Sequence, residues 1–203
     1  SKVEHGEFGD IVGARVKRAI STDPVGDSKA QLHGHPVLYM NIHDIDLLHY
    51  CVDADVDRVT AVERRGELAD AGMDVPDAIQ ALLEFDTGTV ATLEGYGVLP
   101  AEYPDNISAS FELVGTEGVA AVETPGDTVS VHTDRFERPD TRFWPVTNDR
   151  IQGTVRIQID RFADAIAGRA GMAATMVDGY RAHAVADAIQ RSIDTGKPVP
   201  VNY

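Results

Sequence analysis

The hydrophobic period of this sequence changes beyond residue 150, and this change restricts the fold more than any other feature. Apolar and polar side chains alternate in residues 107–115 (ISASFELVG), as expected for a strand with one covered face. Residues 10–20 and 78–85 alternate in the same way, and the tight connection DTG (86–88) predicts a hairpin. Further strands are expected at residues 56–62, 89–99, 119–123, 129–133 and 198–203.

The last part of the chain has apolar residues at helical spacing. Together with one earlier segment, it predicts helices over residues 42–52, 154–167 and 175–194. Thr175 and Asp178 have the spacing of a capping box, and Asn41 and Asp44 have it at the start of the earlier helix. Strands and helices segregated in this way predict an α+β fold, in which an open, mainly antiparallel β-sheet carries helices on one face.

The chain is strongly acidic, with a formal net charge of −15 over 203 residues. Because phosphate contacts need clustered Lys and Arg, we expect no nucleic-acid partner, and anionic membrane surfaces are disfavoured for the same reason. No apolar run approaches the roughly 18 residues that span a bilayer, and the first residues lack the apolar core of a signal peptide. The single cysteine, Cys51, is expected to be a buried, inert thiol, and we expect a cytoplasmic protein.

Polar residues are concentrated where the predicted helix 42–52 begins, in the segment GHPVLYMNIHDIDLLHY (34–50). His43 lies there beside Asp44 and Asp46. One interpretation is a satisfied helix start, because acidic side chains stabilise the first turn. The other is a histidine presented to a substrate pocket, because imidazole titrates near neutral pH and can both take and return a proton. The residues alone leave both interpretations open.

Three histidines in or just before this segment, His33, His35 and His43, also suggest a metal site. However, Gly34 and Pro36 break the stretch QLHGHP into a loop, and the sequence specifies no fourth ligand. A glycine-rich phosphate loop that opens a helix is also missing from the sequence. We therefore expect neither a metal site nor a dinucleotide site on this chain by itself.

Three stretches together resemble the C-terminal domain of the Gfo/Idh/MocA oxidoreductase family, which includes glucose–fructose oxidoreductase and inositol dehydrogenase relatives. EHGEFGDIVGARVKR (4–18) resembles the segment that opens that domain. GHPVLYMNIHDIDLLHY (34–50) resembles the family motif G-G-x-x-x-D-x-G-x-H-x-x-D. Residues 159–201, with the patterns F-x-x-A-I and Asp-Gly and a Ser-to-Lys exit toward a last strand, resemble the closing pair of helices.

The resemblance implies a glyceraldehyde-3-phosphate dehydrogenase-like C-terminal domain that spans residues 1–203. It also implies that NAD or NADP binds mainly to an N-terminal Rossmann domain upstream, which carries a catalytic lysine in an E-K-P motif that this sequence does not contain. The chain would then be the substrate-binding and oligomerising part of an NAD(P)-dependent dehydrogenase for a sugar, polyol or related hydroxyl compound. Alone it would be inactive, and it would form a homo-dimer or tetramer through its sheet face.

By the same resemblance, His43 occupies the position of the family's proton acceptor or relay. Tyr39 occupies the position of the family's aspartate four residues earlier, while His35 and Asn41 replace two of its glycines. These three residues are therefore candidate substrate contacts. Tyr39 can hydrogen-bond a substrate hydroxyl, although it is not a carboxylate at neutral pH.

Two aromatic residues outside the motif are further candidate substrate contacts. Tyr96 lies between two glycines in EGYGV, where a ligand or another chain can approach a strand closely, although such a tyrosine is more commonly part of a sheet surface. Trp144, in a Pro- and Arg-rich loop at 134–150, has the side chain to rim a sugar pocket, or else is a packed aromatic in a solvated loop. A different functional class, a catalytically silent dimerisation or ligand-binding module, also agrees with the sequence.

The acidic composition predicts a salt response. Aspartate outnumbers glutamate by 22 to 11 and arginine outnumbers lysine by 14 to 4, which suits a medium of high ionic strength where self-repulsion is screened. We expect the thermal unfolding midpoint to be well above its dilute-buffer value in molar salt. Equal midpoints in the two media would contradict this halophilic interpretation.

Overall fold

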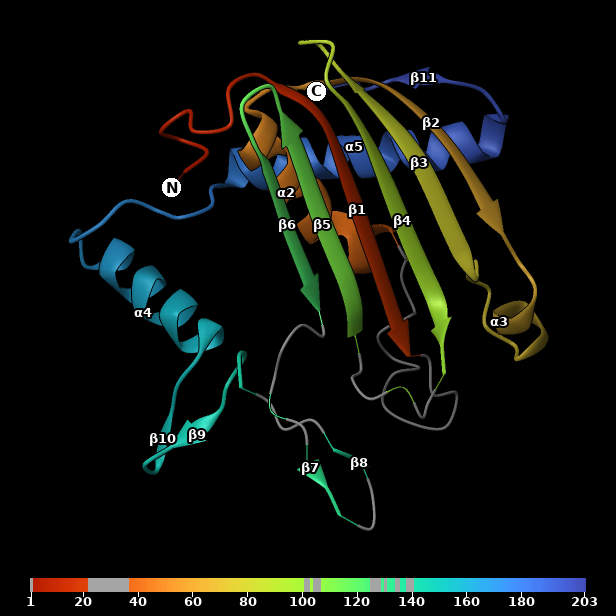
Figure 1. Ribbon diagram of the computed structural model, residues 1–203. Helices are drawn as coiled ribbons and strands as arrows, with labels where there is room; N and C mark the ends of the chain where they lie inside the picture. Colours follow the sequence, from red (N-terminus) through yellow and green to blue (C-terminus); the bar gives the residue numbers. More distant parts are fainter. Residues whose placement is uncertain are drawn as a thin grey trace. The chain divides into compact units, whose positions relative to one another are not determined.

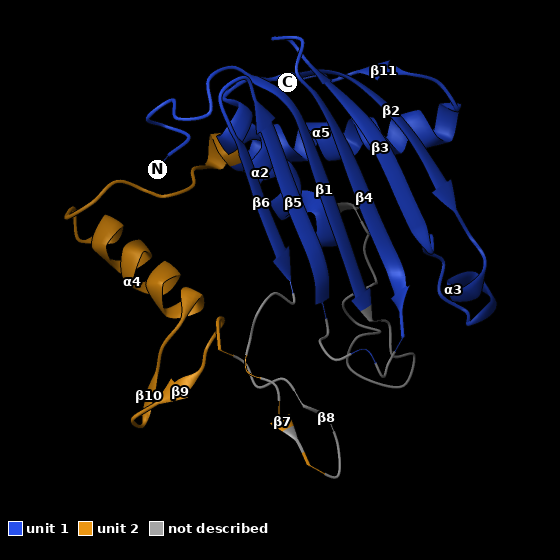
Figure 2. Cartoon of the chain, viewed as in Figure 1, with its two compact units in different colours: residues 1–126, 179–203 blue, residues 127–178 orange. Residues whose placement is uncertain are grey.

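The computed structural model describes residues 2–21, 37–100, 103, 107–124, 129, 131–133, 136–137 and 141–203. Figure 1 shows the elements and Figure 2 shows two compact units, which are described separately below. The first unit comprises residues 1–126 and 179–203, and the second comprises residues 127–178. No helix in the described part of the chain is long and apolar enough to cross a membrane.

A seven-stranded sheet forms the first unit, with strand order β11-β2-β3-β4-β1-β5-β6. The strands are β1 (Ile11–Ser21), β2 (Val56–Arg64), β3 (Ala78–Phe85), β4 (Val90–Leu99), β5 (Ile107–Gly115), β6 (Val119–Thr124) and β11 (Val199–Pro200). The β1–β4 pair is parallel, and the other five pairings in this sheet are antiparallel. The mainly antiparallel sheet and the β3–β4 hairpin are thus confirmed.

The position of β1 differs from a simple meander. Strand β1 lies between β4 and β5, parallel to the first and antiparallel to the second. Val16 therefore faces Leu93 on one side and Phe111 on the other. The chain leaves β1, forms α2 and the antiparallel strands β2, β3 and β4, and only then adds β5 beyond β1, so the first strand lies inside the sheet next to its central strand, β4.

Helices α2 (Ile42–Val52) and α5 (Met176–Thr195) lie on the same side of this sheet (Figure 1). The alternation in the strands turns every second side chain toward them, so Val59, Leu83 and Leu93 are buried against Ile45 and Ile189. We call this side the helix face and the opposite side the open face. A short helix, α3 (Glu67–Asp70), lies between β2 and β3 and packs Leu68 into a small separate cluster.

The two predicted helix starts have different outcomes. Thr175 and Asp178 form the predicted capping box, since the Thr175 amide donates to Asp178 Oδ2 at 2.7 Å and the Asp178 amide donates to Thr175 Oγ1 at 3.4 Å. At the start of α2 the prediction was wrong. A π-helical turn, η1 (Val37–Asn41), runs directly into α2, and Asn41 keeps helical backbone angles and makes no side-chain capping bond. The backbone is already helical there, so Asn41 cannot cap it.

The far end of α2 is fixed by the last residue of the chain. Tyr203 accepts a hydrogen bond from the Val56 amide at 2.9 Å, and its hydroxyl lies 3.3 Å from His49 Nε2. Burial, as the main cause, raises the pKa of the Tyr203 hydroxyl to about 12, so this group stays protonated and able to donate. The C-terminus thereby joins the end of α2 to the start of β2.

The second unit contains the hairpin β9 (Val146–Thr147) and β10 (Arg150–Ile151), the pair β7 (Val131–His132) and β8 (Phe136–Glu137), and helix α4 (Thr154–Ile166). Residues 134–150, expected to be loop only, therefore contain strand residues as well. Helix α4 matches its predicted span but has no buried residue. Four of its large apolar side chains are more than half exposed, namely Ile157, Ile159, Phe162 and Ile166.

The core on the helix face predicts the response to cavity formation. Ile189 is fully buried between α5 and the sheet, so Ile189→Ala should lower the free energy of unfolding by about 2–5 kcal/mol. Ile157→Ala, at a helix position that is 57% exposed, is the matched control and should cost much less than Ile189→Ala. Denaturant titrations measure both, and equal losses would contradict the described core.

Candidate functional site

The site predicted from sequence centres on the junction of η1 and α2. Tyr39 and His43 are both exposed, and they lie four residues apart on this continuous helical segment. Side chains with this spacing lie on neighbouring turns of one helix face. The structure thus presents a phenol and an imidazole together on the surface of the described residues.

Asn41, the third motif position, faces the other way. It is fully buried, and its Nδ2 donates to Asp44 Oδ2 at 3.2 Å and to the Glu94 carbonyl at 3.4 Å. Its Oδ1 lies against Gly95 of β4, where an added Cβ would be only 2.3 Å away. The burial counts against the predicted substrate contact, because the amide nitrogen is already used inside the protein. Asn41 instead connects the start of α2 to strand β4 of the sheet.

An ion pair holds the same turn from the adjacent strand. Arg18 of β1 donates from Nε to Asp44 Oδ2 at 2.8 Å and from Nη2 to Oδ1 at 2.6 Å. Asp44 is 3% exposed, so the pair is largely shielded from water and from screening. The hydrogen bond to Asp44 is the main cause that raises the pKa of Arg18, which stays charged. This bidentate pair fixes both the position and the rotation of the first helical turn.

Tyr96 lies on the open face, opposite the side that carries α2. Side chains alternate along β4, so Gly95 faces Asn41 while Glu94 and Tyr96 point away from it. The Tyr96 hydroxyl donates to Glu94 Oε2 at 2.8 Å and accepts from Gln80 Nε2 at 3.0 Å. Burial is the main cause of the raised pKa of Tyr96. Within one copy of the chain, Tyr96 and His43 therefore do not share a site.

The remaining predicted residues belong to the second unit or lie outside the described residues. Trp144 belongs to the second unit and is 61% exposed. His35 and His33 lie outside the described residues, so the structure does not place them. Among the residues that it does describe, no group of three or more His, Cys, Asp or Glu side chains could hold a metal ion.

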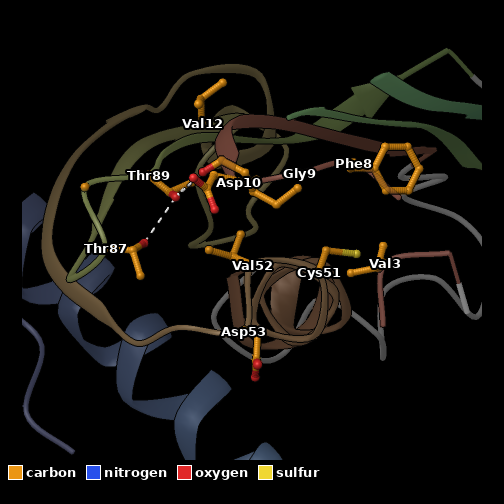
Figure 3. A pocket seen from close by; sticks show the side chains of 12 residues that line it. Val3, Phe8, Gly9, Asp10, Val12, Cys51, Val52, Asp53, Thr87 and Thr89 are labelled. Carbon is orange, nitrogen blue, oxygen red and sulfur yellow. Dashed lines mark hydrogen bonds between the residues drawn. The ribbon is translucent and has the colours of Figure 1, made fainter. Parts of the chain in front are cut away.

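A cavity of about 490 Å³ lies at the opposite end of α2, where sequence reasoning gave no site. Figure 3 shows Cys51 and Val52 at the helix end, with Asp10 and Thr89 above them. Thr87 donates to Thr89 across the β3–β4 turn, and Thr89 in turn donates to the Ile11 carbonyl. Because three segments that are distant in sequence form this cavity, no local sequence motif predicts it. Cys51 is 7% exposed, burial raises the pKa of its thiol, and the prediction of a buried thiol is confirmed.

Comparison with known proteins supports the family suggested by the sequence motifs. The sequence model of the Gfo/Idh/MocA oxidoreductase family, C-terminal alpha/beta domain, matches residues 1–201. The chain belongs to this family. The resemblance first seen in three stretches thus extends over almost the whole sequence, and the expected α+β architecture of the family is the one described above.

Curated proteins that are similar to this chain include oxidoreductases. The chain is 28% identical over 207 residues to the uncharacterized oxidoreductase YrbE of Bacillus subtilis strain 168, covering 99% of this chain and 58% of YrbE. It is 30% identical over 164 residues to inositol 2-dehydrogenase 2 of Saccharopolyspora erythraea, covering 79% of this chain and 45% of that enzyme. The chain therefore spans less than two thirds of the length of these relatives.

Solved structures share the fold. Scyllo-inositol dehydrogenase from Lactobacillus casei, with bound NAD(H) and scyllo-inositol, superimposes with a TM-score of 0.75 at 22% identity, covering 98% of this chain and 59% of that one. Myo-inositol 2-dehydrogenase from Lactobacillus plantarum gives a TM-score of 0.73 at 22% identity, covering 99% of this chain and 60% of that one. At this identity the likeness establishes the architecture only.

Proposed function

We propose that this chain is the substrate-binding domain of an NAD(P)-dependent oxidoreductase that acts on a sugar, polyol or related hydroxyl compound. The observation that carries the proposal is His43, an exposed imidazole on a helical turn that the partly buried Arg18–Asp44 pair anchors to the sheet. Membership of the oxidoreductase family and the inositol dehydrogenases among its relatives support the substrate class.

Oxidation of a hydroxyl compound requires loss of a hydride from carbon and of a proton from oxygen. A nicotinamide cofactor would take the hydride, and it would be held outside the described residues, because these include no glycine-rich turn between a strand and a helix that could cradle a pyrophosphate. His43 would accept the proton from the hydroxyl oxygen.

Tyr39 would orient the substrate beside His43. Its phenol can donate to one hydroxyl oxygen and accept from another. A carboxylate in the same position would only accept hydrogen bonds at neutral pH and would add a negative charge. The tyrosine therefore favours an uncharged, hydroxyl-rich substrate over one that is recognised through a cation. We expect the chain to be inactive when the cofactor-binding part is missing.

Removal of the imidazole tests the proposed proton transfer. In the complete protein, His43→Asn should lower kcat by about 10²-fold or more with inositols or sugars as substrates, because asparagine cannot take up the proton. His183→Asn, at an exposed histidine of α5 on the same unit, is the matched control and should leave kcat unchanged. Steady-state rates with NAD and with NADP measure both variants. Equal rates for His43→Asn and the unmodified protein would refute the role.

The second proposal concerns assembly, and it holds for the enzyme as well as for a catalytically silent module. We infer that two copies of the chain pair through the open face of the sheet. This face exposes Val62, Leu82, Val90 and Val98. It also carries side chains of both charges, namely Arg15, Lys17, Arg58, Arg64, Glu84, Glu94, Glu112 and Glu123.

Two features of this face favour a second copy as its partner. Ion pairs Arg15–Glu94 and Arg58–Glu84 balance the charge locally, so two such faces can meet without the repulsion expected for a chain of net charge −15. An antiparallel sheet with helices on one face can bury its other face in a symmetric dimer.

A charge placed in the middle of this face should separate the copies. Leu82 is 41% exposed on β3, and Leu82→Glu should shift the protein to its monomer mass at micromolar concentration. Val122→Glu places the same charge on β6, on the helix side of the sheet, and should leave the mass unchanged. Sedimentation equilibrium measures both; a dimer that persists in Leu82→Glu would contradict this interface.

A further inference from the structure

Two buried polar residues close to His43 in the sequence are both hydrogen-bonded to strands of the sheet. Asn41, two residues before it, is fully buried on β4, and Asp44, one residue after it, is paired with Arg18 of β1. Two different strands therefore hold the single helical turn that presents the exposed imidazole. We call Arg18, Asn41, Asp44 and Gly95 the anchor cluster.

Gly95 is the part of the cluster that sets its geometry. The strand approaches Asn41 so closely that an added Cβ would lie 2.3 Å from Asn41 Oδ1 and 3.3 Å from Cγ. Real Cβ atoms do not tolerate the first distance, so a side chain at this position would displace Asn41 from its present conformation. Among the described residues no donor reaches Asn41 Oδ1. A buried oxygen without a hydrogen-bond donor lowers stability. Stability alone therefore does not explain the placement of Asn41, whereas a role in positioning the adjacent helical turn does.

We propose that the anchor cluster positions His43, and that Arg18, Asn41 and Asp44 act on the reaction only through it. The catalytic part of this inference rests on the proposed function, whereas the positioning itself is a property of the chain. The turn lies near the beginning of the helical segment formed by η1 and α2, where helices open most readily. Here Arg18 fixes the turn from β1, and Asn41 fixes it from β4. The imidazole consequently keeps one location relative to the sheet.

The first test changes Gly95 and reads out the ring of His43. In an NMR spectrum, the His43 Cε1–H signal, assigned by its loss in His43→Asn, should shift or broaden in Gly95→Ala, since the new methyl group displaces Asn41. Gly13→Ala is the matched control: its Cβ would meet Val90 O at 3.5 Å, an ordinary contact, and the signal should stay in place.

A double variant shows whether the effect passes through Asn41. In an Asn41→Ala background the methyl group at position 95 has room, so Gly95→Ala should cause no further change in the His43 signal beyond that of Asn41→Ala alone. A full additional shift would overturn the proposed route. If Gly95→Ala alone does not fold, Asn41→Ala with and without Gly95→Ala still decides the question.

The second test alters the ion pair between Arg18 and Asp44 with little change in side-chain size. Asp44→Asn preserves the size of the side chain but loses the ionic bidentate pair, and Arg18→Lys keeps the charge but loses the planar fork. Both should move the His43 signal. In the complete protein both should lower kcat by about 10-fold or more with a smaller change in KM, because a misplaced acceptor slows proton transfer more than binding.

The outcomes separate the two proposals. An unchanged His43 signal in folded Asn41→Ala and Asp44→Asn would overturn the positioning role, whatever the activity of the complete protein. A signal that moves as expected, in a complete protein without dehydrogenase activity, would support the positioning role and refute the proposed function. A loss of activity with KM and kcat unchanged per folded molecule would reveal a purely structural role and would also overturn the inference.

Discussion

The ion pair between Arg18 and Asp44 is the interaction on which the arrangement of the candidate site depends. A buried pair of this kind is weak evidence for stability, because desolvation of two charges offsets much of their attraction. Its geometric effect is stronger, since a planar guanidinium that donates twice to one carboxylate fixes distance and rotation together. Removal of Arg18 would leave the buried Asp44 carboxylate without its partner, so the pair also disfavours alternative placements of the helix start.

The ends of α2 are held by different means. At its start, β1 and β4 supply the Arg18 guanidinium and the Glu94 carbonyl, while at its end Tyr203 bridges toward His49 and Val56. Between them the apolar side chains of the helix pack on the sheet, with Ile45 and Leu48 fully buried. A helix with both ends fixed cannot slide or rotate on the sheet. The exposed face that carries Tyr39 and His43 is therefore defined by contacts on the opposite, buried side of the helix.

Three consecutive residues of β4 connect the two sides of the sheet. Glu94 gives its carbonyl to Asn41, while its carboxylate binds Arg15 and Tyr96 on the open face. Gly95 lies on the helix face directly under Asn41. The candidate site and the proposed pairing surface are thus built on the same short piece of strand. Strand alternation is the physical reason, because neighbouring residues must point to opposite faces.

Much of the fold could be read from the sequence because it is encoded locally. Periods of two and of 3.6 predicted β3, β5 and α2 with their observed bounds, and the capping box at Thr175 was confirmed. The parallel β1–β4 pair could not be predicted, since no local pattern specifies which distant strand becomes a neighbour. Asn41 was misread for a related reason. Its role depends on a glycine in another strand, 54 positions later, and a capping rule considers only the residues nearby.

The exposure of His43 bears on which functional class is correct. A proton acceptor that faces water exchanges its proton with the solvent, so directed transfer from a substrate requires a second surface that covers the ring. Within the described part of this chain, His43 is exposed, and the cavity of about 490 Å³ lies at the other end of the helix. The chain nevertheless fixes the turn beneath the ring from two strands, which is more order than an ordinary surface helix start requires. An anchored yet uncovered imidazole therefore agrees with the proposal that the nicotinamide cofactor is held outside the described residues.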